Sequence, residues 1–342
     1  MYVPPRPSAK DDPLFPARIG ALCAAMLVMT QLTAPQMPPL AIALPVGIAL
    51  GQRGAFNPAK IIGAGLAIPL IAWALSFVFA LTREIPWLMV LLAFALNLGG
   101  IHLARRNGNP AGMLLTIVVV MLSTMALQHR AMLNIMRDEL TSAMLFAVPV
   151  LVVLYALLPP KTRRIHLDEV TAPRPDMLPG SVIRAIVLTG FCFWLYAVLP
   201  AQDMMLAVAA LFPLVFPSPN EMRAEARQRS AGTLLGVLGA GLALAIFTAV
   251  PMFVVLLAIF AISGVVFGWL MIHGRAPVLV YQFGLTVLLG VVATALTSAS
   301  PAQAAISRIA LTLGGAMGAV LAIVLLEYLW ARLSQHHRPQ PA

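Results

Sequence analysis

Charged residues are scarce in this chain of 342 residues: Asp, Glu, Lys and Arg make up 10% of it, whereas 61% is hydrophobic. A water-soluble domain has about 25% charged residues, so this composition excludes one. Apolar runs of about 18 residues or more recur along the chain, which predicts membrane-spanning helices. The strands of a membrane β-barrel would alternate apolar and polar residues, and these runs do not.

Cysteine is also rare, and no catalytic or metal-binding group of residues is evident. The two cysteines, Cys23 and Cys192, lie inside apolar segments, where cysteine is typical of packing rather than of a disulfide or a metal site. The six histidines have no ligand spacing with acids. A membrane enzyme needs a catalytic cluster in or near the bilayer. We therefore expect no enzyme activity, no metal and no cofactor.

Acidic residues are outnumbered, and the net charge is +10. The basic residues fall in short loops between apolar segments, which is the pattern that orients membrane proteins. No nucleic-acid motif accompanies them. No Lys-Ser or Lys-Thr follows the glycine-rich stretches, which excludes a nucleotide loop and argues against an ATP-driven pump. We therefore expect the chain to have the lipid bilayer as its partner, and not a nucleic acid.

Apolar sequence is abundant and divides into twelve expected spans, so the predicted fold is an all-α, polytopic membrane protein. The first six spans cover residues 17–33, 38–51, 59–81, 85–104, 110–128 and 139–158. The last six cover 181–199, 202–217, 230–249, 251–272, 277–298 and 305–331. Two transmembrane repeats are thus expected, with the following boundaries: a tail at 1–16, a repeat at 17–158, a Pro-rich linker at 159–180, a repeat at 181–331 and a tail at 332–342.

The distribution of basic residues predicts the orientation. With the N-terminus in the cytoplasm, alternate crossing leaves four of the 22 Lys and Arg residues outside, namely Arg83, Arg130, Arg137 and Arg308. Basic residues accumulate on the cytoplasmic side of membrane proteins, so this asymmetry supports the number of spans and places both termini in the cytoplasm. The N-terminal segment has no signal-peptide pattern, and we expect no cleaved signal.

Two expected spans are short and contain proline: the second has Pro45 and the eighth has Pro213. A re-entrant second span would leave Arg53 and Lys60 outside, so we interpret both as short crossing or broken helices. A broken helix exposes backbone groups that can face a substrate. A simple kink is the alternative interpretation.

The two halves repeat similar residues at a nearly constant separation, which indicates an internal repeat. The matched groups are Arg18 with Arg184, Lys60 and Gly63 with Arg229 and Gly232, Pro45 with Pro213, and Arg137 and Thr141 with Arg308 and Thr312. Chance similarity between apolar helices is the alternative. Six spans in each half would make both halves enter from the same side, as parallel repeats with a transport path at their interface.

Small residues mark expected contacts between helices. Gly232 and Gly236 in one span, and Gly314 and Gly318 in another, have the spacing that lets two helices approach closely. Gly63 has the corresponding place in the first half. We interpret these glycines as contacts within the chain rather than as a dimer motif.

Few polar residues are expected at membrane depth, and they form the candidate site. Arg184 and Arg229 lie at inner ends of spans, where they would attract anions, and Arg308 lies at an outer end, where it would attract an anion or anchor its helix. The pair Tyr281 and Gln282 would line a substrate path or pack between helices.

Glu327 is the candidate for proton coupling, because it is an acid within the last expected span. It lies near the cytoplasmic end of that span. An interfacial carboxylate beside Arg332 is therefore the alternative interpretation.

The second half contains MMLAVAALFPLVFPS, a basic turn and then RQRSAGTLLGVLGAGLAL. This order resembles the fusaric acid resistance and aromatic acid exporter superfamily, whose members have a hydrophobic helix pair, a basic turn and an R-x-x-G-T-x-x-G helix in each half. Residues 161–331 match best, and the R-x-x-x-T-x-G-G motif at Arg308 also fits. Residues 17–158 match in layout, with the motif reduced to Lys60-x-x-Gly63. The chain lacks the large cytoplasmic domain of longer members and resembles a compact inner-membrane branch.

The resemblance implies export of small organic, often aromatic, acids across the inner membrane of Gram-negative cells. It also implies a periplasmic membrane-fusion adaptor as partner. We expect a proton-driven secondary exporter. Two alternatives stay open: an anion channel of the same layout, which needs no coupling acid, and a membrane scaffold that transports nothing. The substrate and the oligomeric state, with a homo-oligomer among the alternatives, also stay open.

Overall fold

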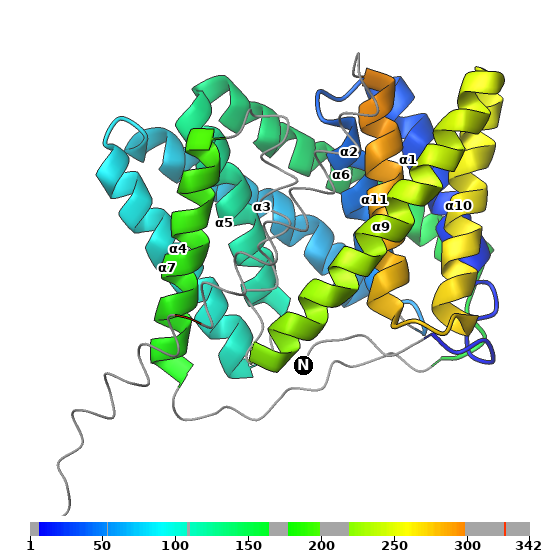
Figure 1. The fold of residues 1–342 in the computed structure, drawn as a ribbon, viewed down its shortest axis with the longest axis horizontal. Coiled ribbons are helices and arrows are strands. Elements are labelled where there is room, and N and C mark those ends of the chain that lie inside the picture. The colour runs from blue at the N-terminus through cyan, green and yellow to red at the C-terminus, as the bar shows by residue number, and fades with distance from the viewer. Residues whose placement is uncertain are drawn as a thin grey trace, which may run out of the picture.

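The computed structural model describes residues 7–52, 54–107, 110–163, 177–198 and 219–297, together with Leu325. Within these ranges the chain forms ten α-helices and no β-strand, packed side by side as one bundle (Figure 1). The helices are α1 (Phe15–Thr33), α2 (Pro38–Gly51), α3 (Pro58–Thr82), α4 (Pro86–Asn107), α5 (Pro110–Gln128), α6 (Arg130–Leu157), α7 (Met177–Val198), α9 (Pro219–Ala249), α10 (Phe253–His273) and α11 (Val278–Thr297).

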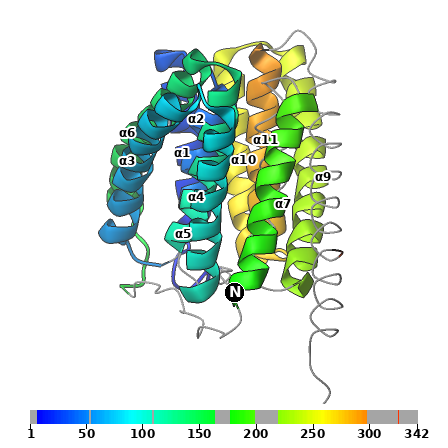
Figure 2. The same ribbon diagram turned by 90° about the vertical axis from the view of Figure 1, so that its left-hand side faces the viewer.

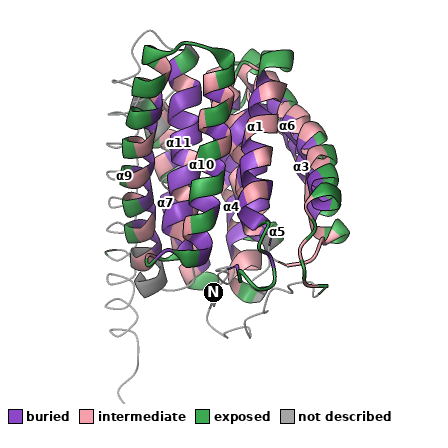
Figure 3. Cartoon of the chain, turned by 90° about the vertical axis from the view of Figure 1, so that its right-hand side faces the viewer, coloured by how far each residue is buried: buried purple, intermediate pink, exposed green. Residues whose placement is uncertain are grey.

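Eight of the described helices are long and apolar enough to cross a membrane. The apolar parts of the other two, Pro38–Gly51 in α2 and Leu178–Trp194 in α7, are shorter. Outward-facing side chains agree with a lipid surrounding: Leu66, Leu70 and Phe77 on one stripe of α3 are 58%, 69% and 67% exposed. A large apolar surface of this kind is unfavourable in water and fits lipid tails. Figure 3 shows exposed residues along the outer helices.

Most helix boundaries agree with the expected spans, and two start well before them. The expected span at 38–51 coincides with α2, whereas α6 begins at Arg130 instead of 139 and α9 at Pro219 instead of 230. Hydropathy marks only the apolar part of a helix. Polar residues before this part can form the same backbone hydrogen bonds, so the helix can begin earlier than its apolar run. The expected spans at 202–217 and 305–331, and most of the linker, lie outside the described residues.

Prolines mark the beginnings of many helices. Proline is the first residue of α2, α3, α4, α5 and α9, and the second residue of α1. Its fixed φ suits the first turn, where its missing N–H would have no partner in any case. At α3 the cap is completed by Asn57, whose side-chain oxygen accepts a hydrogen bond from the Lys60 backbone N–H at 3.1 Å.

Helices from the two halves of the sequence are interleaved. Between the halves, α1 packs on α10 and α4 packs on α7. Within each half, α3 packs on α5 and α9 packs on α11. The short helix α2 contacts α11 as well as α1 and α6. In Figure 2, α3 and α6 form one edge of the bundle and α9 forms the other. Buried side chains form two clusters, one mainly from α3 to α7 and the other mainly from α1, α2 and α9 to α11.

The contacts also place the helix ends. The start of α1 meets the end of α6, where Arg18 Nη1 donates to the Leu158 carbonyl oxygen at 2.8 Å. The turn before α2 meets α6 near its other end, where the Gln36 N–H donates to Glu139 Oε1 at 2.7 Å. We call the end with Arg18 the basic end, which is the lower end in Figure 1, and the end with Gln36 the opposite end.

Candidate functional site

Among the described residues, three buried arginines lie toward the basic end: Arg18 is 2% exposed, Arg184 0% and Arg229 8%. A cation removed from water is unfavourable unless hydrogen-bond acceptors or an opposite charge surround it. The surroundings of each arginine therefore indicate whether it has a structural or a ligand-binding role.

Arg18 is held by contacts from two other segments. Its guanidinium pairs with Asp12, which is also buried, and donates to the Leu158 carbonyl oxygen. The guanidinium carbon lies 4.1 Å from the centre of the Tyr155 ring, a favourable cation–π geometry. This set of contacts attaches the start of α1 to the end of α6 and compensates the charge, which makes a structural role the simplest account of Arg18.

The charge of Arg229 is also compensated by its neighbours. Its Nε lies 2.9 Å from Glu225 Oε1, one helical turn earlier on α9, and its guanidinium carbon lies 4.2 Å from the centre of the Phe283 ring on α11. Glu225 is only 2% exposed. The sequence suggested that Arg229 attracts anions, and the structure pairs it with a carboxylate of its own helix.

Arg184 lies beside a second arginine. It donates to the Gly180 carbonyl oxygen at 2.9 Å, while Arg105 at the end of α4 donates to Ser181 Oγ at 3.1 Å. A Cβ built on Gly180 would lie 2.7 Å from Arg105 Nη1 and 3.1 Å from Arg184 Nη1. Both guanidinium groups thus approach one glycine, and guanidinium groups match the geometry of a carboxylate. We call these residues the Gly180 cluster.

A polar contact also joins α4 and α7 farther from the basic end. Asn97 Nδ2 donates to Thr189 Oγ1 at 3.1 Å, and both residues are buried. Asn97 Oδ1 is buried with no hydrogen-bond partner among the described residues. The α4–α7 interface therefore combines a buried polar pair with the Gly180 cluster at its end.

Tyr281 and Gln282 do not lie at mid-span as expected, but in the first turns of α11. The Tyr281 hydroxyl oxygen accepts a hydrogen bond from the Ala276 N–H at 3.1 Å, so it closes the turn between α10 and α11. Gln282 Oε1 is buried with no hydrogen-bond partner among the described residues.

The second expected span is an uninterrupted helix rather than a broken one. Pro45 is buried inside α2, which the structure assigns as continuous over its 14 residues. Such a helix is about 21 Å long, shorter than a hydrocarbon core of about 30 Å. Proline removes one backbone hydrogen bond, and packing against α1, α6 and α11 supports the remaining helix.

The expected glycine contacts are present in α9, whereas Gly63 contacts no other helix among the described residues. A Cβ on Gly232 would lie 2.7 Å from the Val280 carbonyl oxygen, and one on Gly236 would lie 2.5 Å from that of Gly284, both on α11. Gly63 is exposed, and no described atom lies within 4 Å of its Cβ position. The contact of α3 is made by Gly65 against Val148, because positions two residues apart on a helix face nearly opposite directions.

The sequence did not single out Glu139, which it placed at a span boundary. Since α6 begins nine residues earlier, Glu139 lies inside the helix and is 7% exposed.

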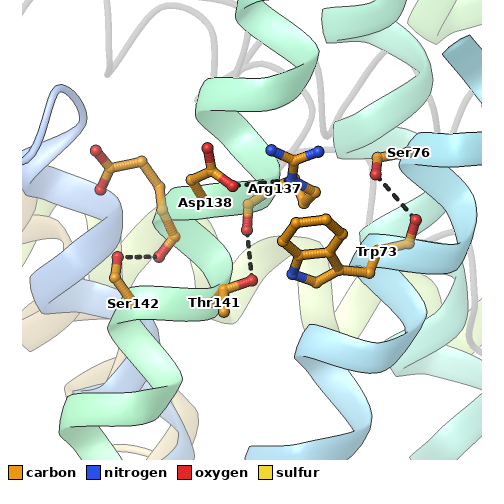
Figure 4. A network of polar contacts seen from close by, with 7 residues as sticks. Trp73, Ser76, Arg137, Asp138, Thr141 and Ser142 are labelled. Atoms are coloured by element: carbon orange, nitrogen blue, oxygen red, sulfur yellow. Dashed lines mark hydrogen bonds and ion pairs between the residues drawn. The ribbon is translucent and has the colours of Figure 1, made fainter.

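Figure 4 shows the contacts of the neighbouring residues on α6: Arg137 lies over the Trp73 ring, 4.0 Å from its centre, and pairs with Asp138. Thr141 donates to the Arg137 carbonyl oxygen at 2.8 Å, a backbone group that any residue at position 137 would offer.

Five further candidates lie outside the described residues: Pro213, Arg308, Gly314, Gly318 and Glu327. Among the described residues, no group of three or more His, Cys, Asp or Glu side chains could hold a metal ion.

The apolar helices define a multi-pass α-helical membrane protein. Residues 191–322 match the model of the fusaric acid resistance protein-like family. The resemblance indicated by the R-x-x-G-T-x-x-G motif is therefore confirmed for this part of the chain, which includes α9, α10 and α11. No curated protein and no solved structure gives a significant match to the chain.

Proposed function

We propose that this protein is a bacterial inner-membrane secondary exporter of small organic acids, in particular aromatic ones. The observation that carries the proposal is the match of residues 191–322 to the fusaric acid resistance protein-like family, on a chain of apolar helices. The chemistry is transport rather than catalysis. A proton gradient would drive it, and a periplasmic membrane-fusion adaptor would receive the substrate.

The proposed architecture is twelve spans arranged as two parallel six-helix repeats, 17–158 and 181–331, with a cytoplasmic linker. Reciprocal packing supports it: if α1 corresponds to α7 and α4 to α10, then the α1–α10 and α4–α7 contacts are equivalent. The α3–α5 and α9–α11 contacts are a second equivalent pair. Repeats of this kind place the substrate path at their interface.

The proposed orientation puts the basic end and both termini in the cytoplasm. Arg18, Arg105, Arg184 and Arg229 are at or toward this end, whereas Arg137 belongs to the opposite one. This distribution is the one expected for a cytoplasmic face.

The substrate carboxylate would bind at the Gly180 cluster, inside the bundle. Two guanidinium groups at the end of the α4–α7 interface offer the paired donors that carboxylates accept. The rest of the proposed path consists of Pro45, Pro213, Arg229, Tyr281, Gln282 and Arg308, with Glu327 as the coupling acid suggested by the sequence.

The test is the accumulation of a panel of labelled aromatic carboxylic acids in exporter-deficient cells, with and without this protein. Lower accumulation that disappears when the proton gradient is collapsed supports the proposal. An Arg184→Gln variant should lose this effect, and Arg106→Gln, an exposed neighbour at the end of α4, is the matched control. Co-expression of an adaptor tests whether one is required.

Two other outcomes would point elsewhere. Single-channel current steps under voltage clamp would identify an anion channel. Unchanged accumulation for every acid, with and without an adaptor, and without currents, would leave a scaffold and contradict the proposal.

A further inference from the structure

Glu139 differs from the other buried acids of the described chain in what surrounds it. Asp12, Glu139 and Glu225 are 2%, 7% and 2% exposed. Asp12 pairs with Arg18, and Glu225 pairs with Arg229. Glu139 forms no ion pair in the described part of the chain. Its neighbours Arg137 and Asp138 pair with each other, with 2.8 Å between Nε and Oδ1.

Instead of an ion pair, the carboxyl group of Glu139 accepts hydrogen bonds from backbone N–H groups. Oε1 accepts a hydrogen bond from the Gln36 N–H at 2.7 Å, and the Met37 N–H also donates to the carboxyl group. Oε2 is buried and has no hydrogen-bond partner among the described residues. One oxygen is therefore engaged, and the other faces neither a hydrogen-bond donor nor a cation among the described residues.

The backbone that Glu139 binds is the turn leading into α2. In this turn Ala34 has φ 45° and ψ 56°. This left-handed backbone conformation is unfavourable for residues other than glycine. The hydrogen bonds to Gln36 and Met37 hold the strained turn on α6. Because α2 also contacts α11 of the second half, a change at this turn can reach the interface between the proposed repeats.

The described helices that pack on α6 are α1, α2, α3 and α5, and they contain few ionisable side chains. The helices α2 and α5 contain no ionisable side chain. The ionisable residues of α1 are Arg18, bound at the basic end, and the buried Cys23. On α3 the ionisable residue is Lys60, in the first turn at the basic end. At the opposite end, α6 itself carries Arg130, Arg137 and Asp138, and Arg83 and Glu84 follow α3. Of these charges, Asp138 acts on the Glu139 carboxyl group, and Arg137 pairs with Asp138.

We propose that Glu139 is the proton-binding carboxyl of the transport cycle. In this step Oε2 takes one proton from water at the opposite end, and the carboxylate becomes a neutral carboxylic acid. No electrons are transferred, and the proton leaves to the cytoplasm later in the cycle. A charged carboxylate accepts stronger hydrogen bonds than a neutral acid, so protonation weakens the hold of α6 on the turn before α2.

This inference rests on the proposed function, since a channel or a scaffold needs no coupling proton. It also assigns coupling to a residue of the first half, in addition to the Glu327 candidate of the second. The assignment predicts that loss of Glu139 separates substrate movement from the proton gradient.

The test uses purified full-length protein in liposomes and the panel acid that the wild type moves fastest. Glu139→Gln should abolish gradient-driven accumulation against a concentration difference but retain exchange of labelled for unlabelled acid without a gradient. Asp138→Asn, at the adjacent and more exposed acid, is the matched control and should retain both. A Glu139→Gln variant with wild-type uphill transport would overturn the inference, as would equal loss of uphill transport and exchange.

Two further results keep the test decisive. If the wild type moves no acid in either mode, the proposed function fails before Glu139 is in question. If Glu139→Gln does not fold, Glu139→Asp replaces it: the shorter acid still carries a proton but reaches Gln36 poorly. A changed pH dependence of its transport supports the inference, and an unchanged one contradicts it.

Discussion

Gly236 of α9 and Gly284 of α11 are in direct backbone contact, close enough that a Cβ on Gly236 would lie 2.5 Å from the Gly284 carbonyl oxygen. One turn earlier, a Cβ on Gly232 would lie 2.7 Å from the Val280 carbonyl oxygen. Both obstacles are backbone atoms, which cannot move aside as a side chain would. The packing of α9 on α11 therefore depends on glycine at these positions.

Replacement of Gly236 by alanine should destabilise the protein. The added methyl group forces α9 and α11 apart, and overpacking of this kind costs about 1–3 kcal/mol. Gly241→Ala is the matched control, because no described atom lies within 4 Å of its Cβ position. Thermal unfolding in detergent should show a lower midpoint for Gly236→Ala alone. Equal midpoints for the two variants would contradict the packing.

The buried pair of Glu225 and Arg229 should be more costly to break than to remove. Loss of one partner of a buried ion pair costs about 3–5 kcal/mol, whereas apolar replacement of both is often neutral. Glu225→Met and Arg229→Met should each lower the unfolding midpoint, and the double variant should recover part of the loss. Arg83→Ala, which breaks the exposed contact with Glu84, should change stability by about 1 kcal/mol or less. Additive losses in the double variant would argue against the pair.

Gly180→Ala should impair transport more than stability. The new methyl group would meet the guanidinium ends of Arg105 and Arg184, which are flexible and can move away from their present positions. Loss of one hydrogen bond to a charged group corresponds to about 1.5–3 kcal/mol, so we expect the initial rate of acid export to fall about tenfold or more. Gly190→Ala on the same helix has no described neighbour within 4 Å and should transport normally. A normal rate for Gly180→Ala would exclude the cluster from the path.

The orientation can be tested by labelling cysteines in intact cells with a membrane-impermeant maleimide. Glu84→Cys, at a position whose side chain is 82% exposed at the opposite end, should be labelled. Lys161→Cys, at an exposed position near the basic end, should be labelled only after the cells are opened. The native Cys23 and Cys192 are 0% and 2% exposed, so the wild type serves as an unlabelled control. The reverse pattern would invert the proposed topology.

The candidate site could be predicted only in part, and individual residues show why. Arg184 was predicted from its charge beside an apolar run, but its approach to Arg105 joins helices that are distant in sequence. Gly63 was selected by analogy, whereas the helix phase brings Gly65 to the contact. Glu139 was placed at a boundary because hydropathy does not reveal where a polar helical turn begins.

The sequence by itself determined where most of the described helices lie. Apolar length and proline at helix starts are local properties, and with them the bounds of the helix at 38–51 were predicted to the residue. Only the tertiary structure decided which polar groups meet, such as Arg18 with Tyr155 and Gln36 with Glu139. In lipid, apolar surface does not distinguish one helix neighbour from another, so close backbone contacts and buried hydrogen bonds select the partners, and these exist only once the helices are packed.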